Sequence, residues 1–183
     1  MNPEVRLFLE AALTLNIVFV LFVGMLVPIF AELTVRRSLT AGLKHALLVA
    51  LAGVTGSALI HLVAVDAPYW APAIIASVSL VSVSLLRRWG ELQGEWAGIP
   101  RSLLALAPVS GVQFFIWTSG VSGLDAVIVS FGAGLGYYFG IVIVVTTIEQ
   151  IRLAEAPWWS KRLGTLLFAV AVFALGFAGF QFL

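Results

Sequence analysis

Six apolar runs of about 20 residues each limit the fold of this chain more than any other sequence feature. They cover roughly residues 11–33, 45–65, 71–86, 102–118, 126–148 and 163–183. A helix needs about 20 apolar residues to cross the roughly 30 Å hydrocarbon core of a bilayer. Only short breaks separate the runs. The pattern predicts an all-α integral membrane protein with six transmembrane helices in a single domain, residues 1–183.

The composition supports residence in a bilayer. Hydrophobic residues make up 61% of the chain and charged residues 10%, whereas a soluble domain is about 25% charged. A net charge of +1 gives no reason to expect a nucleic-acid partner. Cysteine is absent, which excludes disulfides, thiolate-bound zinc and cysteine-ligated clusters held by this chain alone. With only two histidines and no catalytic triad or carboxylate pair, we predict no cofactor, metal or catalytic site in the chain.

The basic residues predict the orientation of the helices. Every Lys and Arg except Arg6 falls in the breaks after the first, third and fifth runs: Arg36, Arg37, Lys44, Arg87, Arg88, Arg101, Arg152, Lys161 and Arg162. Cytoplasmic loops are enriched in positive charge. We therefore expect a multi-pass protein of a bacterial-type inner membrane with both termini on the periplasmic side. The basic pairs are interpreted as topology signals rather than as ligand sites.

Two similar pentapeptides suggest an internal duplication. "DAPYW" occupies residues 66–70 and "EAPWW" occupies residues 155–159. Three predicted spans separate equivalent points, and three is odd, so the second half would run through the membrane upside down. The halves would be about 1–90 and 91–183. The alternative is that both are ordinary helix starts, with Pro in the first turn and aromatic residues at the interface.

Glycine and proline interrupt the first span and its counterpart, the fourth. Gly24 and Pro28 lie in "GMLVP", and Pro108 and Gly111 lie in "APVSG". Such pairs occur in discontinuous helices that expose backbone groups near the bilayer midplane. We therefore predict two inverted three-helix repeats with broken helices 1 and 4. For either span alone, a harmless kink explains the residues equally well.

Two amide side chains are the polar groups expected deepest in the membrane. Asn16 lies in the first span and Gln113 in the fourth, and each could hydrogen-bond to backbone freed by a broken helix. A role as a polar contact between packed helices is the somewhat stronger interpretation. The sequence places no carboxylate securely at the midplane. This weakens the hypothesis of a stand-alone proton- or sodium-coupled carrier.

The fifth span carries a glycine pattern. Gly132, Gly136 and Gly140 recur every four residues and therefore share one face of a helix. This spacing is typical of close contact between membrane helices. The segment "GAGLG" superficially matches a dinucleotide-binding loop, but the strand, turn and helix that such a loop requires are missing. We interpret the glycines as packing residues.

Three stretches together resemble a known family. They are "LNIVFVLFVGMLVP", with Asn16 and Gly24 at matching positions, "GAGLGYYFGIVIVVTTIEQIRLAEAP", and "FAVAVFALGFAGFQ". They are similar to the six-helix membrane subunits of Rnf complexes and of the sodium-translocating NADH:quinone oxidoreductase. The similarity covers essentially the whole chain. The expected external termini resemble the subunit type that has both ends outside.

The resemblance implies a redox setting but not its cofactor. In that family, two oppositely oriented homologous subunits each supply two cysteines to a shared [2Fe–2S] cluster, which passes electrons between flavin-bearing partners. Here Leu26 and Phe114 occupy the matching positions, and neither side chain can ligate iron.

The resemblance therefore favours a subunit of an Rnf-like electron-transfer complex, not catalytic alone, that holds no cluster and has a scaffold role or contributes to an ion or quinone path. The oppositely oriented subunit would be one partner, and flavin-bearing membrane subunits would be the others. The alternatives are a small inverted-repeat transporter or channel, and an assembly protein.

Overall fold

The computed structural model describes residues 2–14, 16, 27, 35–63, 67–90, 92–96, 98–154 and 163–178. Six α-helices make up most of this part of the chain: α1 (Pro3–Leu9), α3 (Val35–Val63), α4 (Ala71–Arg88), α5 (Leu106–Thr118), α6 (Gly123–Leu153) and α7 (Leu163–Ala178). The shorter elements are a π-helical turn η1 (Glu10–Thr14), two 3₁₀ turns η2 (Pro68–Trp70) and η3 (Arg101–Ala105), and an antiparallel hairpin of β1 (Glu95–Trp96) and β2 (Ile99–Pro100). The prediction of an all-α fold is confirmed.

Three helical segments of the described chain are long and apolar enough to cross a bilayer. They are Ser38–Val63, Pro68–Arg88 and Gly123–Leu153, with mean hydropathies of 2.1, 1.7 and 2.0. A shorter apolar segment, Leu167–Gly176, lies in α7. At 1.5 Å per residue, α6 is about 46 Å long and exceeds the hydrocarbon thickness. The protein is therefore a multi-pass membrane protein.

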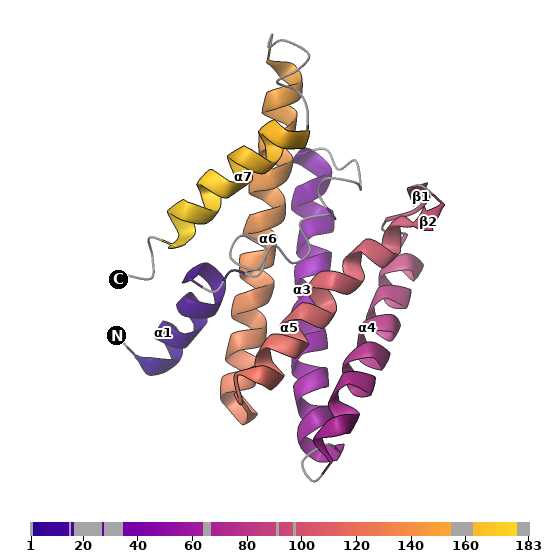
Figure 1. The fold of residues 1–183 in the computed structure, drawn as a ribbon, viewed down its shortest axis with the longest axis vertical. Helices are drawn as coiled ribbons and strands as arrows, with labels where there is room; N and C mark the ends of the chain where they lie inside the picture. Colours follow the sequence, from indigo (N-terminus) through magenta and orange to yellow (C-terminus); the bar gives the residue numbers. More distant parts are fainter. Residues whose placement is uncertain are drawn as a thin grey trace.

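An antiparallel pair formed by α3 and α6 lies at the centre of the bundle. Gly42 of α3 faces Tyr138 and Ile141 of α6, whereas Gly53, further along α3, faces Ser130, which comes earlier in α6. Figure 1 shows α4 on one side of this pair, α1 and α7 on the other, and α5 crossing the pair diagonally. The buried apolar core runs along the same pair, so α3 and α6 are the frame on which the other helices pack.

One face of α3 carries exposed leucines. Leu39, Leu43, Leu47 and Leu51 recur every four residues and are all about half exposed. Residues with this spacing share a helix face. In a membrane protein such an apolar stripe faces lipid, so this side of the helix needs no polar side chains.

The start of the second span differs from the sequence prediction. We expected a loop up to about residue 44, but α3 already begins at Val35, so Arg36 and Lys44 lie on a helix. Ser38 is buried and its hydroxyl donates to the Val35 carbonyl. The helix therefore begins before the apolar run and includes basic residues. Each added residue gains a backbone hydrogen bond, so a helix that has formed can continue beyond the apolar segment.

The predicted break between Pro108 and Gly111 is wrong. Helix α5 runs without interruption from Leu106 to Thr118 and passes through both residues. Pro108 is the third residue of the helix, where the backbone N–H has no intrahelical partner, so proline costs little there. The irregular backbone lies earlier, in the 3₁₀ turn η3.

The other predicted break and most of the repeated pentapeptides lie outside the described residues. Gly24, Leu26 and Pro28 are not among the described residues, and neither are residues 155–159. From "DAPYW", Pro68 begins the turn η2 that leads into α4, and the Tyr69 and Trp70 rings are exposed, with centroids 5.8 Å apart. Exposed aromatic rings at the start of a span are typical of the membrane interface.

Candidate functional site

Asn16 is the amide that joins the first helical segment to the centre of the bundle. It lies just beyond η1 and is fully buried. Its side-chain nitrogen donates to the carbonyl of Ala12, at 3.2 Å, and to the carbonyl of Gly136 in α6, at 2.8 Å. Both amide hydrogens are therefore used. The bond to Ala12 reaches back to a carbonyl of the turn η1.

Two of the spaced glycines in α6 let the first segment approach this closely. A Cβ atom added at Gly136 would lie 2.5 Å from the Ala12 carbonyl oxygen, and one at Gly132 would lie 2.7 Å from the Phe8 carbonyl oxygen. Both obstacles are backbone atoms, which cannot rotate away. Gly140 is buried further along the same helix. Glycine at 132 and 136 thus lets the backbone of the first segment pack directly against α6, which brings Asn16 within hydrogen-bond distance of the Gly136 carbonyl.

The opposite side of α6 makes a second set of close contacts that the sequence analysis missed. A Cβ at Gly134 would lie 2.7 Å from the Ala46 carbonyl oxygen of α3, and one at Gly53 would lie 2.6 Å from the Ser130 hydroxyl. Gly134 is two residues from both Gly132 and Gly136 and so faces another helix. The sequence "GAGLG" contained this signal, because two interleaved glycine patterns indicate two packed faces.

Gln113 ties α5 to two other helices. The side chain is 1% exposed. Its nitrogen donates to the Ser79 hydroxyl of α4, at 3.0 Å, and to the Val109 carbonyl, at 2.9 Å. Gly56 of α3 lies directly against the amide, in a position where a Cβ would overlap the Gln113 side chain. Within the described residues, Gln113 Oε1 has no hydrogen-bond partner.

The two amides do not form one site in the described part of the chain. Asn16 bonds to η1 and α6, whereas Gln113 contacts α3, α4 and its own helix. Pro108 is buried and Gly111 half-buried along α5. Asn16, Gln113 and Pro108 are therefore buried between packed segments.

Phe114 lies on the outside of α5. Its side chain is 54% exposed, and its ring meets that of Trp117 edge-on, with centroids 5.7 Å apart and planes at 68°. Successive residues of a helix point in directions about 100° apart. This explains why Gln113 is buried and Phe114 is exposed.

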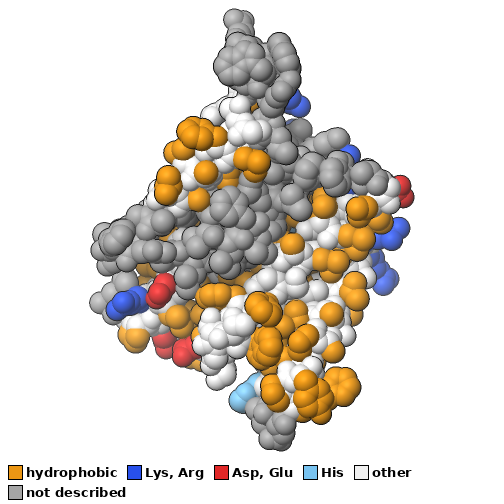
Figure 2. Space-filling model, in the orientation of Figure 1, with side chains coloured by type: hydrophobic (Ala, Val, Ile, Leu, Met, Phe, Trp, Pro, Cys, Tyr) orange, Lys and Arg blue, Asp and Glu red, His pale blue; other side chains and the backbone are white. Residues whose placement is uncertain are grey.

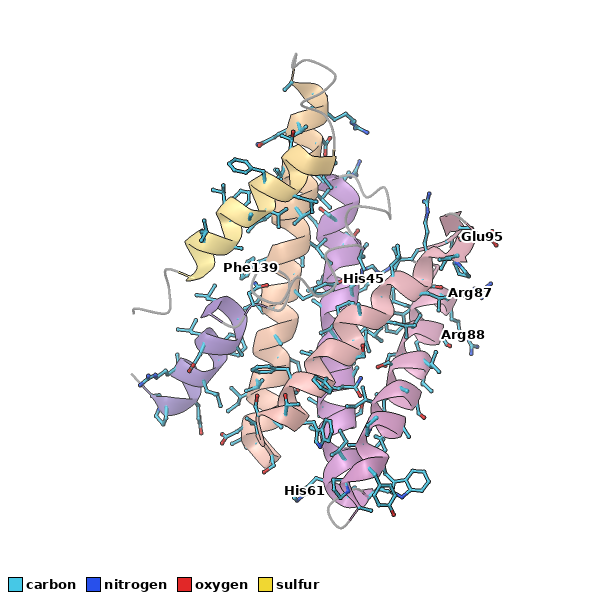
Figure 3. All side chains as sticks on the ribbon, in the orientation of Figure 1. His45, His61, Arg87, Arg88, Glu95 and Phe139 are labelled. Atoms are coloured by element: carbon cyan, nitrogen blue, oxygen red, sulfur yellow. The ribbon has the colours of Figure 1, made fainter. Side chains whose placement is uncertain are left out.

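The residues present do not fit an iron–sulfur cluster. Cysteine is absent from the whole chain, and the described residues contain no group of three or more His, Cys, Asp or Glu side chains that could hold a metal. Both histidines lie in α3, at His45 and His61 (Figure 3). At 1.5 Å per residue their backbones are about 24 Å apart, so they cannot share an ion.

Glu149 makes a contact between distant parts of the chain that no local sequence pattern predicted. Its Oε2 accepts a hydrogen bond, at 3.1 Å, from the backbone N–H of Val35, the first residue of α3. A carboxylate at a helix N-terminus satisfies a free donor and interacts favourably with the helix dipole. The contact joins residues 114 positions apart, so only the tertiary structure could reveal it. It connects the start of α3 with the last turns of α6.

A shallow hollow lies where α3 and α5 end. It has a volume of about 280 Å³ and is lined by Ser57, His61, Pro68, Trp117 and Ser122, among others. The lining is mostly apolar with a few hydroxyl groups, and Figure 3 shows His61 at this end of the molecule, far from His45. Neither of the buried amides lines it.

No family model matches the chain, but it is similar to membrane-complex subunits of known bacteria. Over 189 aligned residues the chain is 23% identical to a subunit of the proton-translocating ferredoxin:NAD(+) oxidoreductase complex of Clostridium ljungdahlii, covering 99% of this chain and 97% of that protein. Over 83 residues it is 29% identical to a subunit of the Na(+)-translocating NADH-quinone reductase of Haemophilus influenzae strains PittEE and PittGG, covering 45% of this chain and 41% of that protein. Over nearly its whole length the chain is therefore similar to a subunit of a proton-translocating redox complex, and over just under half of its length to a subunit of a sodium-translocating one.

Proposed function

We propose that this chain is a membrane subunit of an Rnf- or Nqr-like ion-translocating redox complex, and that its own role is structural. It would hold no iron–sulfur cluster and would support partners that carry the redox groups. The observation that carries the proposal is a relationship over 99% of the chain, combined with a complete lack of cysteine. The scaffold is kept, whereas the side chains that could ligate iron are not present.

The buried amides support a structural role. Asn16 donates both of its amide hydrogens to backbone carbonyls, and Gln113 donates both of its own to Ser79 and Val109. Hydrogen bonds of this kind hold membrane helices together. Groups used in this way fix η1 against α6 and α5 against α4, which is what a scaffold must do.

The arrangement also supports the proposed inverted repeat and orientation. The central pair α3 and α6 is antiparallel, as equivalent second helices of two inverted halves would be. Arg36 at the start of α3, Arg87 and Arg88 at the end of α4, and Arg152 at the end of α6 lie toward one end of the bundle. This end would face the cytoplasm, with both termini on the periplasmic side.

The partners would be flavin-bearing membrane subunits together with an oppositely oriented homologous subunit. Phe114 presents an exposed ring on α5, in edge-on contact with the half-buried ring of Trp117. Aromatic side chains are frequent in protein interfaces, and this surface lies beside the buried amide of Gln113. A homologous protein packed there would meet an apolar surface without any iron ligand from this chain.

Purification from the native membrane tests the proposal. An affinity-tagged chain should bring down flavin-bearing subunits together with a homologous membrane subunit, and flavin should be visible in the optical spectrum of the assembly. The isolated chain should contain no stoichiometric iron. The proposal fails if the chain purifies alone from mildly solubilised membranes, with neither flavoprotein nor sister subunit.

A flux assay separates this function from the transporter alternative. The purified chain, reconstituted alone into liposomes, should move neither Na⁺ nor H⁺. Flux by the chain alone that is lost on changing Gln113→Leu would favour a small transporter and would overturn the scaffold proposal.

A further inference from the structure

A second hollow lies at the opposite end of the molecule from His61, between the end of α4 and the β1–β2 hairpin. Its volume is about 370 Å³, and Arg87, Gln93, Glu95 and Ser102 contribute side chains to its lining. Figure 3 shows Arg87 and Arg88 beside Glu95 at this edge, and Figure 2 shows basic side chains gathered there. Both arginines are exposed, and neither forms an ion pair with a described residue.

The walls of this hollow are held in place by the fold. Leu92 adopts a left-handed backbone conformation, with φ of 52°, that is unfavourable for a leucine, and its side chain packs against the apolar core. Such a conformation persists only where the surrounding structure enforces it. The Arg101 N–H donates to the Gly94 carbonyl, at 3.1 Å, and the hairpin pairs Glu95 with Pro100. Packing and backbone hydrogen bonds therefore hold this side of the hollow in a fixed conformation.

The lining offers the donors that a phosphate needs. Arg87 supplies a guanidinium, Gln93 an amide and Ser102 a hydroxyl. Ser102 is 4% exposed, and its hydroxyl makes no hydrogen bond to the described residues. Arginine matches the geometry of phosphate oxygens and forms short, charge-assisted hydrogen bonds with them. Among the described residues that line the hollow, Glu95 is the one acidic group, and it would oppose an anion.

The apolar surface beneath the hollow indicates where the phosphate comes from. Leu80 lies two turns before Arg87 on the same face of α4, and Val81 and Leu85 lie below Arg88. All three apolar side chains are 42–62% exposed, and Trp89, directly after the arginines, is 49% exposed. An acyl chain along this face would place its headgroup at Arg87, with the indole at the interface.

We propose that this hollow binds the phosphate headgroup of an anionic phospholipid whose acyl chains lie along α4. Arg87, Gln93 and Ser102 would donate to the phosphate oxygens, and Arg88 would add positive charge at the rim. The site goes beyond the structural role proposed above and does not depend on it, because it uses only residues of this chain.

Native mass spectrometry of the full chain, titrated with phosphatidylglycerol or with phosphatidylcholine, tests the site. Phosphatidylglycerol should bind more tightly, and Arg87→Gln should weaken it about fivefold. Ser102→Ala should weaken it about threefold. Arg36→Gln is the matched control, because Arg36 is exposed at the same end of the bundle but does not line the hollow. It should leave the affinity unchanged.

Glu95→Gln removes the opposing charge and should tighten binding, which keeps the test decisive if Arg87→Gln fails to fold. Equal losses in Arg87→Gln and Arg36→Gln would show general attraction to the basic end of the protein and overturn the proposal. Weaker or unchanged binding by Glu95→Gln would also overturn it. Inorganic phosphate should not displace the lipid; full displacement would identify a soluble phosphate compound as the ligand instead.

Discussion

Adding one methyl group at Gly136 tests the close contact between the first helical segment and α6. In Gly136→Ala the new Cβ would lie 2.5 Å from the Ala12 carbonyl oxygen and 3.1 Å from Asn16 Nδ2. No real Cβ tolerates the first distance, and the obstacle is backbone. The segment that contains η1 must therefore move away from α6. This movement stretches the 2.8 Å hydrogen bond from Asn16 to the Gly136 carbonyl.

The expected loss can be worked out from these two effects. Overpacking a tight contact costs about 1–3 kcal/mol, and a hydrogen bond between membrane helices contributes about 0.6–1.7 kcal/mol. Alanine is the better helix former by about 1 kcal/mol, which partly offsets the loss. Gly176→Ala in α7 has the same propensity gain, and its Cβ would meet no atom within 4 Å. Relative to this control, Gly136→Ala should lose about 2–4 kcal/mol.

Unfolding of the purified protein in mixed micelles, with a rising fraction of sodium dodecyl sulfate, measures the difference. Circular dichroism reports the loss of helix. Asn16→Ala should cost about 1 kcal/mol in the parent but much less in the Gly136→Ala background, where the bond is already broken. Equal midpoints for Gly136→Ala and Gly176→Ala would refute the contact, and full additivity with Asn16→Ala would refute the shared cause.

Three further experiments test two other contacts and the orientation in the membrane. Gly56→Ala should destabilise the protein by about 1–3 kcal/mol. The double variant Gly56→Ala with Gln113→Ala should lose less stability than the sum of the two single variants, because the smaller side chain at 113 makes room for the new methyl group. Additive losses in the same unfolding assay would contradict this. Glu149→Ala should lower the stability by about 1 kcal/mol, because it removes the cap from the start of α3. Glu149→Gln should lower it less, because glutamine keeps an acceptor oxygen. Thermal unfolding measures both variants, and equal losses of stability would argue against capping. The chain has no cysteine, so Gln93→Cys, just before the β1–β2 hairpin, and Ser119→Cys, directly after α5, can be labelled singly. An impermeant thiol reagent added to intact cells should reach only Ser119→Cys, and the reverse pattern would invert the proposed orientation.

The sequence predicted the positions of the helices well where hydropathy alone sets them. The third run was expected at 71–86, and α4 spans Ala71–Arg88. The fifth run was expected at 126–148, within the observed Gly123–Leu153. The errors occur where polar residues continue a helix, as at the start of α3, and where proline is tolerated, as at Pro108 in α5. In both cases the result depends on backbone hydrogen bonds rather than on side-chain hydropathy.

The candidate residues were harder to interpret than the helices. The spacing of Gly132 and Gly136 identified a face for close packing, but not that the opposing atoms are the carbonyls of Phe8 and Ala12. Asn16 and Gln113 stood out as deep amides, yet their acceptors belong to partners as far as 120 residues away in the chain. Nothing in the local sequence pointed to Glu149 as the cap of α3.

What the sequence alone determined is membrane residence, helical class and a basic end of the molecule. These follow from the free energy of transferring each residue into lipid, which adds up locally along the chain. Only the tertiary structure decided which carbonyl each amide meets, which glycine face contacts which helix, and where a hollow forms beside Arg87. Those outcomes depend on the distances between segments far apart in sequence, and such distances are set by the packing of the whole bundle.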